Sequence, residues 1–378
     1  MTGLDSKLDV LITTWSGGGA SQPAIGLGRL LVERGHRVRI VAPAVLAGRI
    51  TAAGCVPRAF PRGLEFDPGL GRAFEDQPAF ARELFFGQAL PDAVATEIAA
   101  DHADVVVVDY LLRSVVCRAE GLAVPHALVM HMAHHHHAQP VSEDRSEWSQ
   151  RWQYEQVNAT CVELGLDLLP VGPESVSVAL AGRAAAALVV MTKEFDGWPS
   201  PPPSVVHVGP IAEEVEGVDW DAPWAADDRR PLIVISMSTM YVHQEEILRR
   251  VASSIANLNA RVLVLTGSEL APGEVAWPPG VQVRNYVPHR TVLPGAALVV
   301  THGGMGTLMA AFSAGVPTLC LPLGRDQVAN ARKARALGAS ALLAPDSGTA
   351  EIQRAVEAAL ASRPLRAGAN DMAAKARG

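Results

Sequence analysis

The chain has 378 residues, of which 49% are hydrophobic and 19% charged, a composition that excludes a disordered or fibrous protein. Its formal net charge of −7 excludes the basic surface of a nucleic-acid-binding protein. The chain is too long for one compact core, so we expect two domains.

The sequence contains no recognisable membrane anchor, export signal or disulfide framework. Its first apolar run, residues 8–15, is short, and no run approaches the roughly 18 apolar residues that span a bilayer. The four cysteines stand far apart and form no CxxC pair, which is typical of reduced thiols. We therefore expect a cytoplasmic protein that binds neither a membrane nor nucleic acid.

The first half begins with a strand, a glycine loop, a helix and a second strand, over residues 8–43. A parallel strand pair joined by a helix is the repeating unit of doubly wound sheets. Apolar runs without alternation suit strands covered on both faces, and three follow at 103–112, 125–133 and 186–192. The glycine loop itself, residues 16–23, reads SGGGASQP and holds no group that ionises near neutral pH.

A segment rich in proline and acidic residues, 196–224, separates the two halves. Proline fixes φ and removes a hydrogen-bond donor, so we predict a linker here rather than a helix or strand. The DWD sequence at 219–221 has the spacing of a metal-binding motif, but its place in this segment favours an acidic linker. The predicted bounds are 1–208 for the first domain, 209–228 for the linker and 229–378 for the second domain.

The second half repeats the same order of elements over residues 231–267 and continues with apolar runs at 280–287, 296–304 and 317–323. The predicted fold class is therefore α/β, with two Rossmann-like domains whose parallel sheets face a central cleft. Ligands of such sheets bind beyond the carboxyl ends of the strands, so the loops that follow strands are the candidate sites.

The densest signal lies at residues 299–330, which read VVTHGGMGTLMAAFSAGVPTLCLPLGRDQVAN. We expect His302 to end a strand, the glycines after it to form a turn, and Thr307 to open a helix. Backbone amides approach an anion closely at glycines, and a helix N-terminus adds roughly half a positive charge. The pattern predicts a diphosphate site that needs no metal, with Asp326 and Gln327 suited to binding sugar hydroxyls.

At this point the sequence resembles the inverting glycosyltransferases of the GT-B fold, of the actinobacterial natural-product kind that uses nucleotide-linked deoxysugars. The resemblance implies transfer of a sugar from a nucleoside diphosphate, expected to be thymidine diphosphate, to a small-molecule aglycone such as a polyketide. It implies neither a metal nor a cofactor. The matching motifs occur in the family's order and are LVVMTKEFD (188–196), HVGP (207–210), ISMST (235–239), VPHRTVLPGA (287–296), HGGMGT (302–307) and AGVPTLCLPLGRDQ (314–327).

The resemblance assigns each donor-site residue a role. His302 would contact the phosphates together with the backbone that follows it, and the backbone at Val287 would hold the nucleobase. Ser238 and Thr239 would contact the distal phosphate. The expected donor residues are Ser238, Thr239, Val287, His302, Gly303, Gly304, Met305, Gly306 and Thr307, with Asp326 and Gln327 at the sugar.

The family's usual catalytic base lies three residues before a proline in the first loop, and here that position is Ala20, which cannot accept a proton. The family's supporting carboxylate matches Asp109. Asp109 is therefore the first candidate base, and His131 or His134 is the second. The third alternative is an acceptor acidic enough to need little help, such as a phenol or an activated carbon, so the formation of a C–O or a C–C bond stays open.

The acceptor is expected at the first glycine loop and at a helical stretch that Ser142 could start. The small side chains of the loop would leave room for the substrate, and two tryptophans four residues apart could form an aromatic platform or part of the core. The histidine run at 131–137 would line this pocket, bind a metal incidentally or form a solvated loop. The expected acceptor residues are Gly18, Gly19, Ala20, Trp148 and Trp152.

Other functions and assemblies remain open alternatives. One is a sugar-nucleotide epimerase of similar twin-domain shape, and another, motivated by Ala20, is a donor-binding subunit that needs a helper protein. A homodimer is also open. The tail, residues 361–378, contains Pro364, so the family's long C-terminal crossing helix is expected to be short or absent.

Overall fold

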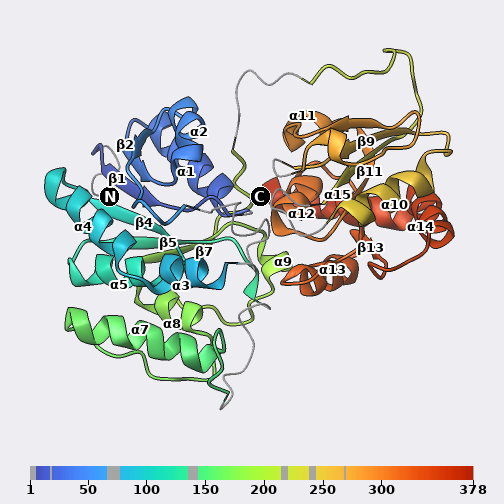
Figure 1. The fold of residues 1–378 in the computed structure, drawn as a ribbon. Coiled ribbons are helices and arrows are strands. Elements are labelled where there is room, and N and C mark those ends of the chain that lie inside the picture. Colours follow the sequence, from blue (N-terminus) through green and yellow to red (C-terminus); the bar gives the residue numbers. More distant parts are fainter. Residues whose placement is uncertain are drawn as a thin grey trace. The chain divides into compact units, whose positions relative to one another are not determined.

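The computed structural model describes residues 6–17, 19–65, 77–134, 144–213, 220–237, 244–267 and 270–377. The described residues divide into two compact units, 6–213 and 220–377 (Figure 1), and each is taken by itself below. The change from one unit to the other lies inside the predicted linker, 209–228.

The first unit is a parallel sheet with helices, and its strand order is β3-β2-β1-β4-β5-β6-β7. Its strands are β1 (Asp9–Thr13), β2 (Arg37–Val41), β3 (Val56–Arg58), β4 (Val105–Asp109), β5 (His126–Met130), β6 (Ala186–Val189) and β7 (Val205–His207). Its helices are α1 (Ser21–Glu33), α2 (Ala47–Ala52), α3 (Pro78–Phe86), α4 (Ala89–Ala100), α5 (Arg113–Gly121), α7 (Gln150–Leu164), α8 (Val176–Arg183) and α9 (Lys193–Asp196).

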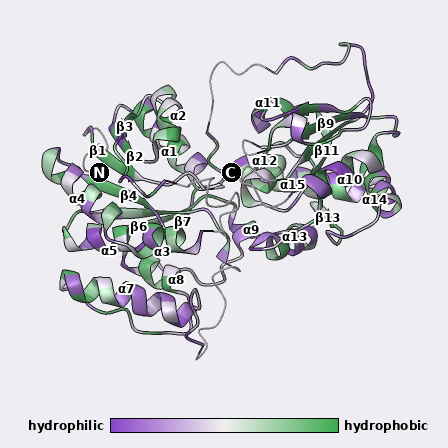
Figure 2. Cartoon of the chain, viewed as in Figure 1, coloured by the Kyte–Doolittle hydropathy of each residue, from purple (hydrophilic) through white to green (hydrophobic). Residues whose placement is uncertain are grey.

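The central strands are apolar along their length because helices cover both faces of the sheet. In β4, the side chains of Val106 and Val108 are fully buried and Val107 is 4% exposed. Figure 2 shows β1 and β4 as hydrophobic ribbons, whereas α7 alternates hydrophobic and hydrophilic residues. This confirms the predicted class of a parallel, doubly covered sheet.

One element was missed in the segment predicted to be linker, 196–224. Residues Val205–His207 form β7, which pairs with β6 in parallel at the edge of the sheet. The prolines at 201–203 precede the strand rather than interrupt it, so no ladder hydrogen bond is lost to them.

The second unit is also a parallel sheet, with strand order β10-β9-β8-β11-β12-β13. Its strands are β8 (Leu232–Ser236), β9 (Arg261–Leu265), β10 (Gln282–Arg284), β11 (Ala296–Thr301), β12 (Thr318–Cys320) and β13 (Ser340–Leu342). Its helices are α10 (Glu245–Ile255), α11 (His289–Val292), α12 (Met305–Ser313), α13 (Gln327–Ala336), α14 (Thr349–Ala361) and α15 (Arg363–Arg377).

The C-terminal tail is more helical than its proline suggested. Pro364 lies in the first turn of α15, where a missing N–H breaks no intrahelical hydrogen bond, so the helix continues for 15 residues. Helix α15 packs against α12 of the same unit. At this contact a Cβ on Gly315, whose φ is +70°, would lie 2.8 Å from Asn370 Oδ1.

Candidate functional site

Three strands of the second unit end at the same level, and the candidate donor site follows them. In the ladder, Ser236 of β8 pairs with Thr301 of β11, which pairs with Cys320 of β12. The loops after these strands therefore leave one edge of the sheet, the edge at which open α/β sheets bind ligands.

The loop after β11 becomes a helix earlier than the sequence predicted. Gly304 is the N-cap of α12, so the helix opens at Met305 rather than Thr307. The first helical hydrogen bond runs from Leu308 N–H to Gly304 C=O. The amides of residues 305–307 precede that bond and have no carbonyl partner within the helix. A helix terminus of this kind is suited to binding an anion, and residues 305–307 are only half-buried.

The two glycines of this turn are required by its geometry. Gly303 has a φ of +88°, a backbone conformation that side chains disfavour, and a Cβ there would lie 3.0 Å from Gln327 C=O. A Cβ on Gly304 would lie 2.3 Å from His302 Nε2, so any side chain would displace the imidazole. The turn therefore brings the His302 ring directly against the backbone at the start of α12.

His302 is a neutral imidazole in this environment. Its side chain is buried, at 7% exposure, and burial together with the nearby Arg325 guanidinium lowers the pKa of His302 to about 3. At neutral pH it can offer an N–H donor but no charge. The positive potential of the site comes instead from the start of α12 and from the exposed Arg325.

This neutral histidine predicts a loss of stability in acid. Its folded-state pKa, about 3, lies below the value of about 6.5 in unfolded chains, so below pH 6.5 the unfolded state binds more protons. Between pH 6.5 and 4.5, His302 should remove about 2 kcal/mol from the free energy of unfolding. Urea unfolding of the wild type and His302→Gln at both pH values measures this, and an equal loss in the two proteins would contradict it.

The predicted sugar residues lie beside the turn and are linked to it by Asn330. The Asn330 amide nitrogen donates to Asp326 Oδ2, 2.7 Å away, and to Gly303 C=O, 3.2 Å away. Gln327 is 4% exposed, and its Oε1 accepts the Leu323 amide hydrogen at 2.8 Å. The structure thus brings Asp326 to the turn after β11, while the amide oxygen of Gln327 is hydrogen-bonded to the loop before α13.

The remaining donor residues are only partly described. Val287 is 4% exposed and lies two residues before the start of α11, whereas Ser238 and Thr239 lie outside the described residues. Sequence reasoning missed a contact here, because Ser236 Oγ and His289 Nε2 form a hydrogen bond of 3.2 Å. It joins the end of β8 to the VPHRT motif, and the position of Ser236 at a strand end was the available signal.

In the first unit, the two leading candidates for the catalytic base form a hydrogen-bonded pair. Asp109 ends β4 and His131 follows β5, the neighbouring strand. Asp109 Oδ2 lies 3.0 Å from His131 Nε2, and Asp109 Oδ1 accepts the Leu111 amide hydrogen at 2.9 Å. The Asp109 side chain is 1% exposed and that of His131 is 11% exposed. Because an ionised carboxylate only accepts, this pairing puts the imidazole proton on Nε2 and leaves Nδ1 as a base.

The other histidine candidate, His134, packs against different residues. Its ring stacks on Trp198, with centroids 4.4 Å apart and an interplanar angle of 13°. Its backbone N–H donates to Asp196 Oδ1 at 2.6 Å, and Asp196 Oδ2 lies 2.7 Å from His207 Nε2. Asp196 therefore anchors the segment after β5 to β7, and the structure does not bring the His134 ring to Asp109.

The first glycine loop is narrower than expected at its start. A Cβ on Gly17 would lie 1.9 Å from the Trp15 ring, so this indole occupies the space that the glycine leaves, and the expected room for substrate at Gly17 was wrong. Ala20 is 1% exposed and is the N-cap of α1. Gly19 is exposed, and Gly18 lies outside the described residues.

The two predicted acceptor tryptophans belong to an aromatic cluster. Trp148 precedes α7 with a φ of +71°, because the helix begins at Gln150 with Ser149 as its N-cap, so the helix predicted from Ser142 was wrong in placing Trp148 within it. Both tryptophans are half-buried, and their ring centroids are 5.3 Å apart. The aromatic cluster consists of Trp15, Phe85, Phe86, Trp148 and Trp152.

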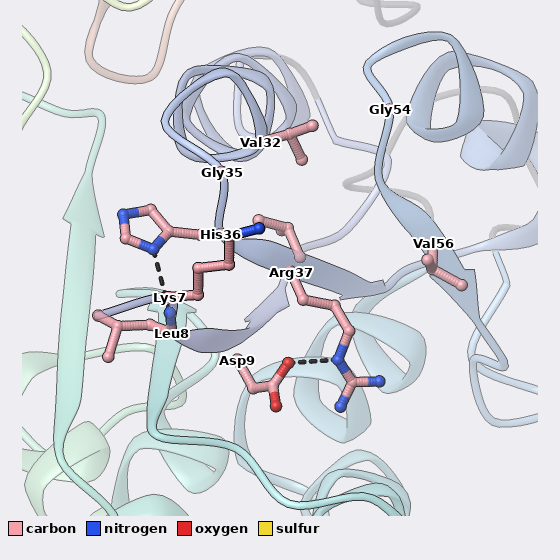
Figure 3. A pocket seen from close by; sticks show the side chains of 10 residues that line it. Lys7, Leu8, Asp9, Val32, Gly35, His36, Arg37, Gly54 and Val56 are labelled. Atoms are coloured by element: carbon pink, nitrogen blue, oxygen red, sulfur yellow. Dashed lines mark hydrogen bonds and ion pairs between the residues drawn. The ribbon is translucent and has the colours of Figure 1, made fainter. Parts of the chain in front are cut away.

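A separate hollow of about 500 Å³ lies at the amino ends of β1 and β2 (Figure 3). Arg37 on its wall pairs with Asp9 and with Asp101, and His36 Nδ1 accepts the Leu8 amide hydrogen. Its place, opposite the strand ends that bind ligands in this fold, gives it no role in the candidate site.

Among the residues that the structure describes, no three histidine, cysteine or acidic side chains gather as ligands of a metal ion. Nor does any described helix combine the length and the apolar composition needed to cross a bilayer.

The sequence of this chain is similar to those of known proteins. Residues 249–377 match the family described as Erythromycin biosynthesis protein CIII-like, C-terminal domain. The oleandomycin glycosyltransferase of Streptomyces antibioticus is 26% identical over 359 residues, which cover 92% of this chain and 81% of that enzyme.

The solved structures agree on the fold. The glycosyltransferase of kitacinnamycin superposes with a TM-score of 0.76 at 19% identity, covering 98% of this chain and 95% of that one. The glycosyltransferase VinC, solved in complex with dTDP, superposes with a TM-score of 0.69 at 19% identity, covering 98% and 96%. At this identity the likeness establishes the fold, which is the one predicted from the sequence.

Proposed function

Since the chain is a glycosyltransferase of the GT-B fold, we propose that it transfers a deoxysugar from thymidine diphosphate to a natural-product aglycone with inversion at the anomeric carbon. The observation that carries the donor half is the turn from His302 to Thr307. There, three amides without helical partners and one buried imidazole converge beside Asp326. The dTDP bound in the solved structure of VinC supports the choice of nucleotide.

The leaving group would be stabilised by groups already in place. As the bond from the anomeric carbon to the phosphate oxygen breaks, its electron pair stays on the diphosphate. The amides of Met305, Gly306 and Thr307 and the start of α12 meet that charge without reorganisation. A neutral His302 would add an N–H donor. Asp326 would bind sugar hydroxyls, and Gln327 stays a proposed sugar contact.

The acceptor would be activated by His131 rather than by Asp109. Asp109 is buried with both oxygens in hydrogen bonds, so a bulky acceptor has no free carboxylate oxygen to approach. Nδ1 of His131 would take the proton of the attacking hydroxyl while Asp109 stabilises the imidazolium that forms. The pair of His131 and Asp109, called the dyad below, thus supplies the catalytic base that is missing at Ala20. It uses the carboxylate that was expected to support a histidine at position 20.

The dyad also weakens the case for a donor-binding subunit that needs a helper protein. That alternative arose from Ala20, and His131 provides the missing group within the same chain. A homodimer and a cytoplasmic location stay predictions.

The proposal is tested with purified chain, a thymidine diphosphate sugar, a panel of phenolic and macrolide aglycones, and EDTA. We expect glycoside and free thymidine diphosphate to form at the same rate with and without the chelator, because amides and the helix dipole supply the positive potential. Strict dependence on added magnesium would contradict the donor site. Epimerised sugar nucleotide in a reaction without aglycone would favour the epimerase instead.

A further inference from the structure

Arg113, the first residue of α5, is a buried cation without a carboxylate partner among the described residues. It is 7% exposed, and its one hydrogen bond, from Nη2 to Ser177 Oγ, is long at 3.4 Å. Its Nε is buried and makes no hydrogen bond within the described chain. Its guanidinium carbon lies 5.1 Å from the centroid of the Phe86 ring.

This arrangement is costly for the protein without a ligand. A buried charge is destabilising unless it is paired, and burial lowers the pKa of Arg113 to about 10. The start of a helix is itself positive, and the first turn of α5 contains no acidic residue to offset it. The neighbouring Ser114 Oγ is also buried without a partner in the described chain. Two unsatisfied groups thus stand at one helix terminus.

The Asp109 carboxylate does not offset this cost. Asp109 attracts Arg113 electrostatically, but its two oxygens are already committed to His131 and to the Leu111 amide. No ion pair between Asp109 and Arg113 forms within 4.0 Å. The guanidinium therefore retains N–H donors for an anion that is not part of the described fold.

The surroundings indicate which kind of anion fits. Arg113 follows β4, on the same strand-to-helix connection as Asp109, and it lies over Phe86 of the aromatic cluster. Phe86 in turn contacts Trp148 and Trp152. A ligand here would meet aromatic rings and a guanidinium together, the two groups that recognise a flat ring bearing an acidic oxygen.

We propose that Arg113 binds an acidic oxygen, a carboxylate or an ionised phenol, of an aromatic acceptor whose ring packs on the aromatic cluster. This proposal names the substrate class of the proposed function. It rests on that function, because only a transferase has an acceptor. A guanidinium gives two parallel hydrogen bonds to a carboxylate, so the acid group would also fix the orientation of the ring near His131.

Direct binding tests the proposal without turnover. Quenching of tryptophan fluorescence in the full chain compares 2-naphthoate with the neutral 2-naphthamide. The wild type should bind the acid at least ~10-fold more tightly, and Arg113→Met should abolish this preference, because a charge-assisted pair is lost. Arg118→Met is the matched control, since Arg118 lies on the same helix but pairs with Asp92 at the surface, and it should keep the preference. Equal binding of both probes to the wild type would overturn the proposal.

Thermal unfolding separates a ligand site from a structural role. Removing an uncompensated buried charge should leave the Tm of the ligand-free chain unchanged or raise it, so Arg113→Met should melt no lower than the wild type. A clear fall in Tm would assign Arg113 to the fold and overturn the proposal. Failure of the proposed function has a different signature, namely no transfer to any aglycone and no binding of thymidine diphosphate.

Discussion

Replacing His131 with glutamine should lower kcat by about 10²–10⁴-fold while leaving the Kd for thymidine diphosphate unchanged. Glutamine keeps a polar side chain beside Asp109 Oδ2 but cannot take a proton, so only general-base catalysis is removed. Steady-state kinetics with a saturating donor and calorimetric titration of the nucleotide measure the two quantities.

Two further variants make this result specific. Asp109→Asn should also lower kcat, because an amide no longer stabilises the imidazolium. His134→Gln is the matched control, since its ring stacks on Trp198 rather than on the dyad, and it should retain most of the activity. Normal turnover in His131→Gln would remove this histidine from the mechanism and return attention to an acceptor that needs no base.

Replacing Gly304 with alanine should weaken binding of thymidine diphosphate by about 10²-fold or more. The added Cβ would lie 2.3 Å from His302 Nε2, so the imidazole must leave its place and the approach to the amides of α12 narrows. Loss of two charge-assisted hydrogen bonds, at about 1.5–3 kcal/mol each, accounts for this magnitude. Calorimetric titration of the nucleotide checks it.

The chain offers a close control for this substitution. Gly348 is also a glycine N-cap in extended conformation, before α14 of the same unit, and a Cβ there would meet no atom within 4 Å. Gly348→Ala should therefore bind the nucleotide as the wild type does. Equal affinities for all three proteins would show that the turn after β11 does not hold the diphosphate.

The architecture could be read from the sequence because both sheets are built from long apolar runs. Residues 105–109 are valines up to the final aspartate, which suits a strand covered on both faces, and the glycine turn marks where β11 ends. Short edge elements lack such a signal. β7 has three residues, with exposed Val206 between two half-buried neighbours, so nothing in its pattern distinguished it from the proline-rich segment around it.

The candidate site was predictable to the extent that it follows strand ends. Asp109 and His131 both directly follow apolar runs, and neighbouring parallel strands end at one edge, so their proximity was open to prediction. The residues that were missed depend on contacts distant in sequence. Arg113 is unusual only because Phe86 and Ser177, from two other helices, bury it without supplying a charge.

The predicted starts of two helices were wrong because the geometry of the N-cap, rather than residue type alone, decides where a helix begins. Thr307 is a common first residue by type, but Gly304 takes the N-cap because its backbone can pass close to His302. At α7 the N-cap is Ser149 rather than Ser142, for a different reason. Its hydroxyl accepts the Trp152 amide hydrogen at 3.2 Å.

The most direct test of the donor site is a crystal soaked with thymidine diphosphate. Density for the two phosphates should appear against the amides of residues 305–307 and the imidazole of His302, with the nucleobase toward Val287. Phosphate density at any other place, with this turn empty, would contradict the account.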